Sequence, residues 1–194
     1  MLWRWPNKPK ANHPADGRLV LVLAALSFLG GCTSMYRPVS SMESDALSRS
    51  NRSVFPDDFR SSKVAMGSVE VAWAGVIVDS KVSDAPDQYS VQFEIQHHYY
   101  DWVVDNFRYH LSPRGEGRIR TQWSLVRTMP ADVLAKEIQP GRMIVVYGFP
   151  ESITSDALVV RATYLRTFDP RVFRTDTMDY GRPGTPLKIL TPLY

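Results

Sequence analysis

The regular alternation of residues 89–98 constrains the fold more than any other feature of this 194-residue chain. Successive side chains of a β-strand point to opposite faces, so a half-buried strand shows apolar and polar residues in turn. One face would hold Tyr89, Val91, Phe93, Ile95 and His97, and the other Ser90, Gln92, Glu94, Gln96 and His98. The pattern predicts a strand with one face against a core and one toward water.

Four other segments also have the composition of strands. They are residues 64–82, 118–126, 142–149 and 157–168. The first is rich in β-branched residues and contains Gly67 and Gly75, which strand interiors tolerate mainly at bulges and sharp bends. One convincing helix is predicted at residues 129–141, between the third and fourth strands, with Pro130 in its first turn and Pro140-Gly141 at its end.

Five strands with one short helix between the third and fourth are the order of an OB-fold, a small, partly open β-barrel. The predicted fold class is therefore mainly β, with an OB-like barrel domain at residues 64–168, long enough for one modest core. A β-sandwich is the alternative, although it usually needs about seven strands. A ferredoxin-like fold would need a second helix, which the pattern does not supply.

Residues 1–31 have the two parts of an export signal. Residues 1–18 are polar and basic, and residues 19–29 form the apolar run LVLVLAALSFL. This run is too short for a transmembrane helix, which needs about 20 residues. Its length fits the apolar region of a signal peptide, which normally has about 7–15 residues. The sequence therefore predicts a signal peptide over residues 1–31.

Cys32, the only cysteine of the chain, follows this segment in the sequence Leu29-Gly30-Gly31-Cys32. An aliphatic residue, two small residues and a cysteine resemble the lipobox of bacterial lipoproteins. The resemblance implies transfer of diacylglycerol to the Cys32 sulfur, cleavage before Cys32, and often acylation of the new amino group. Cys32 is thus the predicted lipidation site, and two or three acyl chains would form a permanent membrane anchor. The alternative is a free cysteine buried at the end of a core element.

Removing the signal peptide would also remove the excess positive charge of the chain. Of 23 Lys and Arg and 20 Asp and Glu residues, four basic residues and one acidic residue lie in residues 1–31, which leaves 19 of each sign. A neutral chain has no general attraction for nucleic acid, so we expect no nucleic-acid partner. No motif for a cofactor is found, and none is predicted.

The segments on either side of the predicted barrel lack a sustained apolar period. Residues 32–63 contain nine serines and are predicted to be the lipidated N-terminus and a flexible tether. Residues 169–194 are predicted to be a Pro/Gly-rich C-terminal tail. Within that tail, LKILTPLY is apolar enough to dock on another part of the protein.

Three short segments share a pattern with a known lipoprotein family. They are VEVAWAGVIVDSKV (69–82), SPRGEGRI (112–119) and PGRMIVVYGF (140–149). Together they resemble the Slp family of outer-membrane lipoproteins over residues 66–165, although Ile119 stands where that family more often has an aromatic residue. The resemblance implies a lipid-anchored OB-like barrel on the periplasmic side of the outer membrane, and it implies no catalytic residues. Thr33, in place of Asp, also favours the outer membrane by the sorting rule of enteric lipoproteins.

The segment from His97 to His110 contains the residues most suggestive of chemistry. His97 and His98 are adjacent and would point to opposite faces of a strand, and no spacing typical of a zinc site is present. No metal site is therefore predicted. Ser112 and Ser124 lack the Gly-x-Ser-x-Gly elbow of a hydrolase, so no catalytic residue is predicted and the protein is not expected to be an enzyme.

Aromatic residues dominate the same segment and favour binding. OB-folds hold extended polymers with aromatic and polar side chains. The predicted binding residues, for a glycan or a protein partner, are Tyr99, Tyr100, Trp102, Phe107 and Tyr109. The alternative for these residues is ordinary core and rim packing. The sequence thus predicts a non-enzymatic binding or assembly module of the cell envelope. The alternative function is an envelope hydrolase or metal-dependent enzyme that uses the His97–His110 region.

Overall fold

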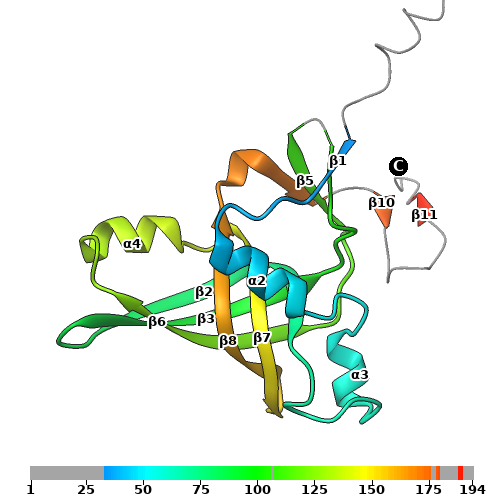
Figure 1. Cartoon of the computed structure of the whole chain (residues 1–194), viewed down its shortest axis with the longest axis horizontal. Coiled ribbons are helices and arrows are strands. Elements are labelled where there is room, and N and C mark those ends of the chain that lie inside the picture. Colours follow the sequence, from blue (N-terminus) through cyan, green and yellow to red (C-terminus); the bar gives the residue numbers. More distant parts are fainter. Residues whose placement is uncertain (1–32, 106, 176–177, 180–187, 190–194) are drawn as a thin grey trace, which may run out of the picture. The chain divides into compact units, whose positions relative to one another are not determined.

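Five strands form a closed barrel in the computed structural model, which describes residues 33–105, 107–175, 178–179 and 188–189 (Figure 1). The strands are β2 (Val71–Asp84), β3 (Gln88–His98), β6 (Arg118–Val126), β7 (Met143–Ile153) and β8 (Ala157–Phe168). Their order around the barrel is β2-β3-β6-β8-β7, and helix α4 (Ala131–Glu137) connects β6 to β7. All neighbouring pairs are antiparallel except β6 and β8, which are parallel.

This arrangement confirms the predicted mainly β, OB-like barrel with one short helix between its third and fourth strands. The barrel is closed rather than partly open, because β6 and β8 pair from Arg118 opposite Ala157 to Gln122 opposite Arg161. Strands β6 and β8 have the predicted bounds. Strand β2 begins at Val71 instead of residue 64, since Gly67 has a φ of +70°, which lies outside the range of a strand.

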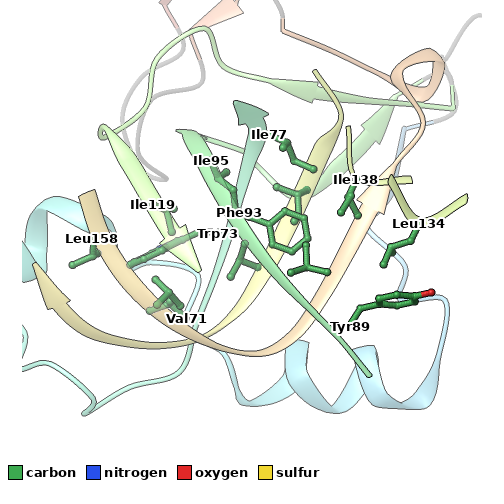
Figure 2. Close-up of a cluster of buried hydrophobic side chains, with 14 of the residues drawn as sticks. Val71, Trp73, Ile77, Tyr89, Phe93, Ile95, Ile119, Leu134, Ile138 and Leu158 are labelled. Atoms are coloured by element: carbon green, nitrogen blue, oxygen red, sulfur yellow. The ribbon is translucent and has the colours of Figure 1, made fainter. Parts of the chain in front are cut away.

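The barrel interior is filled by the apolar faces of its strands (Figure 2). The predicted inward face of β3 is confirmed, because Tyr89, Val91, Phe93, Ile95 and His97 are all buried. Trp73, Ile119 and Leu158 meet this face from other strands, and Leu134 and Ile138 close the cluster from α4 and its C-terminal end.

Gly75 allows β2 and β3 to approach closely inside this barrel. A Cβ atom at residue 75 would lie 2.4 Å from the carbonyl oxygen of Gln96 and 2.5 Å from Cγ2 of Ile95. No side chain fits there without displacing backbone. The register between the two strands then shifts between Ile77 and Asp79. This irregularity lies two to four residues after Gly75, and such irregularities help a short sheet to curve into a barrel.

A second, smaller sheet accompanies the barrel. Its strands are β1 (Thr33–Met35), β4 (Val103–Asp105), β5 (Arg108–Leu111) and β9 (Phe173–Thr175), in the order β1-β4-β5-β9. A second apolar cluster joins residues around this sheet to the outer side of β2, β7 and β8. Its buried members are Tyr36, Ala46, Ala72, Ala74, Tyr100, Trp102, Leu111, Met143, Val145, Tyr147 and Phe168. The described residues therefore form two apolar layers, one within the barrel and one outside it.

The prediction of a flexible tether was wrong for the described residues before the barrel. This segment contains helices α2 (Ser41–Arg49) and α3 (Pro56–Arg60), and α2 lies against β8 (Figure 1). Ser40 caps α2, since its side-chain oxygen accepts a hydrogen bond from the backbone N–H of Glu43 at 3.1 Å. Some apolar residues of this segment are buried, and their packing fixes the segment despite its polar composition. They include Tyr36, Ala46, Phe55 and Phe59.

The C-terminal tail is also partly ordered. A 3₁₀ turn, η1 (Pro170–Val172), leads into β9, which pairs in parallel with β5. Strands β10 (Met178–Asp179) and β11 (Lys188–Ile189) pair with each other. Lys188 and Ile189 are the only described residues of the apolar segment LKILTPLY, and its predicted docking otherwise lies outside the described residues.

Candidate functional site

The aromatic residues predicted to bind a partner do not form one exposed surface. Tyr100 and Trp102 are only 4% and 6% exposed, and Tyr99 and Tyr109 are half-buried. Phe107 alone among the five is well exposed, at 87%. The predicted contact surface was therefore wrong for Tyr100 and Trp102, which belong to the second apolar cluster and leave no ring face free for stacking.

Tyr36 is the reason that these rings are buried. Its ring centroid lies 5.2 Å from that of Trp102 and 6.2 Å from that of Tyr100, both in edge-to-face geometry. Its backbone N–H also donates a hydrogen bond to the Trp102 carbonyl at 2.9 Å. Edge-to-face pairs add about 0.5–1.5 kcal/mol each beyond the area they bury. The N-terminal segment thus covers the aromatic loop that follows β3.

A buried carboxylate holds this N-terminal segment in place. Glu43 is fully buried, and it accepts hydrogen bonds from the hydroxyl of Tyr36, from the hydroxyl of Tyr147 at 3.1 Å, and from the backbone N–H of Val39 at 2.8 Å. The guanidinium of Arg166 on β8 lies 3.3 Å from both carboxylate oxygens. Every oxygen of Glu43 is therefore paired, as a buried charge requires.

Arg166 extends this network to the second sheet. It donates to the carbonyl of Arg37 at 3.1 Å and to the hydroxyl of Tyr109 at 3.3 Å, and it lies 4.3 Å from the ring centroid of Phe168. Burial raises the pKa of Tyr36 far above its ordinary value, so this hydroxyl stays a hydrogen-bond donor at every physiological pH. The network joins the N-terminal segment, the barrel and β5 into one unit.

The histidines of the His97–His110 region do not converge. His97 is buried and its Nδ1 accepts a hydrogen bond from the backbone N–H of Glu116 at 2.9 Å. His98 is half-buried on the other face, where its Nδ1 lies 2.8 Å from the Ser112 carbonyl. His110 lies elsewhere, on β5. Within the described ranges, no group of three His, Cys, Asp or Glu side chains is placed to hold a metal ion.

Acidification should destabilise the protein through His98. Burial lowers the pKa of His98 below its ordinary value of about 6.5, against the weaker opposite effect of the Ser112 carbonyl. The unfolded chain therefore binds more protons than the folded one as the pH falls past about 6.5, and stability present above that pH is lost below it.

This loss is measured as the difference in unfolding free energy, from urea titrations, between about pH 7.5 and about pH 5.5. His98→Asn places an amide N–H at the position of Nδ1, where it can donate to the Ser112 carbonyl, but it does not titrate, so this variant should lose less stability than the wild type. His97 and His110 are present in both proteins and cancel in the comparison. Equal losses in the two proteins would rule out His98 as the source.

The outward face of β3 and β6 is where OB-folds commonly bind their ligands. In this chain that face is polar, and its charges are paired. Glu94 pairs with Arg118 and, at 3.4 Å, with Arg120, which lies 3.0 Å from Asp156. The aromatic residues of the two strands, Tyr89, Phe93 and Trp123, pack with the barrel cluster instead. This face therefore lacks the stacking platform that nucleic-acid-binding OB-folds use.

A polar cavity of about 320 Å³ lies at the second sheet. Asp105, Arg108, His110 and Arg174 line it, from β4, β5 and β9. Nε of Arg174 lies 3.4 Å from Nδ1 of His110, while Arg108 is exposed. The lining therefore combines two guanidinium groups with the carboxylate of Asp105.

Sequence reasoning missed Tyr36, Glu43 and Arg166. One local signal was available, because Ser40-Ser41-Met42-Glu43 has the Ser-x-x-Glu pattern of a helix N-terminus. Pro56 followed by two aspartates is a second signal, for the start of α3. The pairing of Glu43 with Arg166 spans 123 residues, and no local pattern specifies it.

Cys32 and the signal peptide lie outside the described residues, so the lipidation prediction stays a prediction from sequence. Among the residues that the structure describes, no helix combines the length and hydropathy needed to cross a bilayer.

Comparison with known proteins identifies no family. No protein-family model matches the sequence, and no curated protein does. Among the solved structures that match is a small single-stranded DNA-binding protein from Streptomyces coelicolor, which is 14% identical, with a TM-score of 0.31 over 54% of this chain and 95% of that one. The fold assignment rests instead on the strand order and register of the barrel itself.

Proposed function

We propose that this protein is a lipid-anchored lipoprotein of the bacterial outer membrane that faces the periplasm, with its barrel acting as a non-enzymatic binding or assembly module. The observation that carries the proposal is the sequence Leu29-Gly30-Gly31-Cys32 directly after a basic segment and an apolar run. Charge, length, small residues and cysteine agree at this one place. The resemblance to the Slp family supports the outer membrane as the location.

The chemistry of anchoring needs the thiol of Cys32. Its sulfur displaces the headgroup phosphate from the glycerol carbon of a phospholipid, which forms a thioether to diacylglycerol and releases the headgroup phosphate ester. Water then cleaves the peptide bond between Gly31 and Cys32, and the new amino group is free to take a further acyl chain. Each buried methylene of these chains contributes about 0.8 kcal/mol to membrane binding.

The short distance between Cys32 and the packed domain supports a module that works close to the membrane. Tyr36 is the first buried residue of the described chain, four positions after Cys32. A fully extended segment of that length spans at most about 14 Å. The barrel would therefore sit directly at the bilayer, where it meets membrane proteins, assembly complexes and nearby glycans.

Binding is favoured over catalysis by where the polar groups of the barrel lie. The three histidines of the His97–His110 region occupy separate positions, and the buried Glu43 is paired with Arg166 within the fold. Exposed features of the described residues include a hairpin that carries Phe107 and a cavity lined by Asp105, Arg108, His110 and Arg174. In-cell crosslinking of the anchored protein, followed by purification, would identify the partner.

Cys32→Ser is expected to abolish lipidation and release the protein from the membrane. Cells are grown in labelled palmitate, and the protein is then followed in separated inner-membrane, outer-membrane and soluble fractions. The wild type should carry label in the outer membrane, whereas the variant should carry none. Ser34→Ala is the control, because it changes an exposed residue two positions away and leaves the thiol in place. A labelled, outer-membrane Cys32→Ser protein would contradict the proposal.

A further inference from the structure

The register of the second sheet places Thr33, which follows the proposed lipid attachment site in the sequence, beside a hairpin tip. Strand β1 pairs with β4 so that Thr33 lies opposite Asp105. Cys32 is the covalent neighbour of Thr33, so their Cα atoms are about 3.8 Å apart. Strands β4 and β5 pair directly, with Asp105 opposite Arg108, so the hairpin turns immediately beyond Asp105. Figure 1 shows β1 and β5 at the same end of the molecule, away from α3.

Phe107 occupies the turn of this hairpin and projects away from the fold. Its side chain is 87% exposed, the highest exposure among the large apolar residues that the structure describes. Its φ is +62°, a left-handed conformation that is unfavourable for a bulky residue. Backbone strain of this kind is unfavourable and is concentrated at functional positions. Neither the exposure nor the strain contributes to packing within the domain.

One basic residue accompanies Phe107 at the hairpin tip. Arg108 follows it directly, is exposed, and forms no ion pair within the described part of the chain. A cation near an anionic membrane surface is attracted to it. An exposed aromatic ring with an adjacent arginine is the composition of a membrane-interface contact.

We propose that the tip of the β4–β5 hairpin, Phe107 with Arg108, enters the interfacial region of the phospholipid leaflet that holds the acyl chains of Cys32. This inference rests on the proposed function, because it takes the leaflet from the anchor. The Phe107 ring lies among the upper acyl chains and the Arg108 guanidinium pairs with lipid phosphate. The acyl chains hold the protein at the membrane, and the hairpin fixes which side of the barrel faces it.

The test uses the full lipidated chain and its single cysteine. Lipidation converts the Cys32 thiol to a thioether, so Phe107→Cys introduces the only reactive thiol. The purified protein is labelled there with an environment-sensitive fluorophore and placed in vesicles of phosphatidylethanolamine and phosphatidylglycerol. Val126→Cys is the matched control, because Val126 is also strongly exposed, at 74%, but lies at the end of β6. Emission is measured with and without nitroxide-labelled phospholipid.

The proposal expects a blue-shifted emission at position 107 that is lost mostly to the nitroxide lipid, and no quenching at position 126. Equal, water-like emission at both positions would overturn it. Shielding of position 107 in native outer membranes but not in lipid vesicles would also overturn it, in favour of a protein partner at this tip. Palmitate label on the same samples separates the two proposals. If the protein carries palmitate but position 107 is exposed to water, only the proposed membrane contact is contradicted. If the protein carries no palmitate, both the lipoprotein assignment and the membrane contact are contradicted.

Discussion

Glu43→Ala is expected to lower the free energy of unfolding by about 3–5 kcal/mol, the usual cost of removing one partner of a buried ion pair. The substitution leaves the Arg166 guanidinium, whose side chain is only 14% exposed, without its carboxylate. It also removes the acceptor for the hydroxyls of Tyr36 and Tyr147 and for the backbone N–H of Val39. Several buried donors would then lack a partner, each at a cost of about 1–3 kcal/mol before relaxation.

Urea unfolding of Glu43→Ala measures this loss, with Asp84→Ala as the control. Asp84 pairs with Arg127 at 3.0 Å, but both side chains are largely exposed, so that variant should lose at most about 1 kcal/mol. Near-native stability of Glu43→Ala would mean that the N-terminal segment is not fastened by this network. A stable core with a protease-sensitive segment 33–63 would show that the segment detaches without unfolding the barrel.

Trp73→Ala is the second substitution with a large expected effect, a loss of about 3–5 kcal/mol. Trp73 is 1% exposed and lies within the barrel cluster (Figure 2). Its ring packs edge-to-face on Phe59 of α3 at 5.9 Å, and its indole N–H donates to the carbonyl of Val54 at 2.8 Å. Truncation therefore creates a cavity in the barrel and frees the segment that leads into α3.

Comparison of two variants separates these contributions of Trp73. Trp73→Phe keeps most of the ring volume but leaves the Val54 carbonyl without its donor, so the expected loss is smaller, about 1–3 kcal/mol. Thermal and urea unfolding are measured on both variants, with Val126→Ala as an exposed control. If Trp73→Phe were as unstable as Trp73→Ala, the hydrogen bond to the N-terminal segment would outweigh ring packing.

The barrel was predictable because the sequence patterns that specify its strands involve residues close together in the chain. The alternation in β3 assigned each residue to a face, and it was correct down to buried His97 and half-buried His98. The position of the helix between the third and fourth strands then selected the strand order. Gly75 indicated an irregular place in the first strand, and the structure shows that two backbones approach there. Each of these signals depends on neighbouring residues, which a sequence displays directly.

The N-terminal segment was not predictable in the same way, because its stability comes from distant partners. Its serines and charges are typical of a disordered tether. Its order depends on Tyr36 packing against the aromatic loop and on Glu43 pairing with Arg166, which lies on β8. A polar segment can be ordered by a few residues that have buried partners. The average composition of the segment does not reveal those few residues.

The candidate site residues also differ in whether a local pattern is enough to predict them. Cys32 is predicted from a local motif, and that prediction does not depend on the fold. Tyr100 and Trp102 were predicted to contact a partner, but they are buried against residues that precede the barrel. A local sequence pattern does not show that such a distant segment packs on them. The position of Thr33 beside the hairpin that carries Phe107 follows only from the pairing of β1 with β4.

The fastening of residues 33–49 to the barrel has a mechanical consequence. Strand β1 pairs with β4, and the Glu43–Arg166 pair ties α2 to β8. A pulling force at the N-terminal end of β1 therefore acts directly on the hydrogen bonds of the second sheet, without first extending a flexible segment. Displacement of Thr33 would therefore move the barrel with it, so residues 33–49 transmit force to the barrel instead of extending under load.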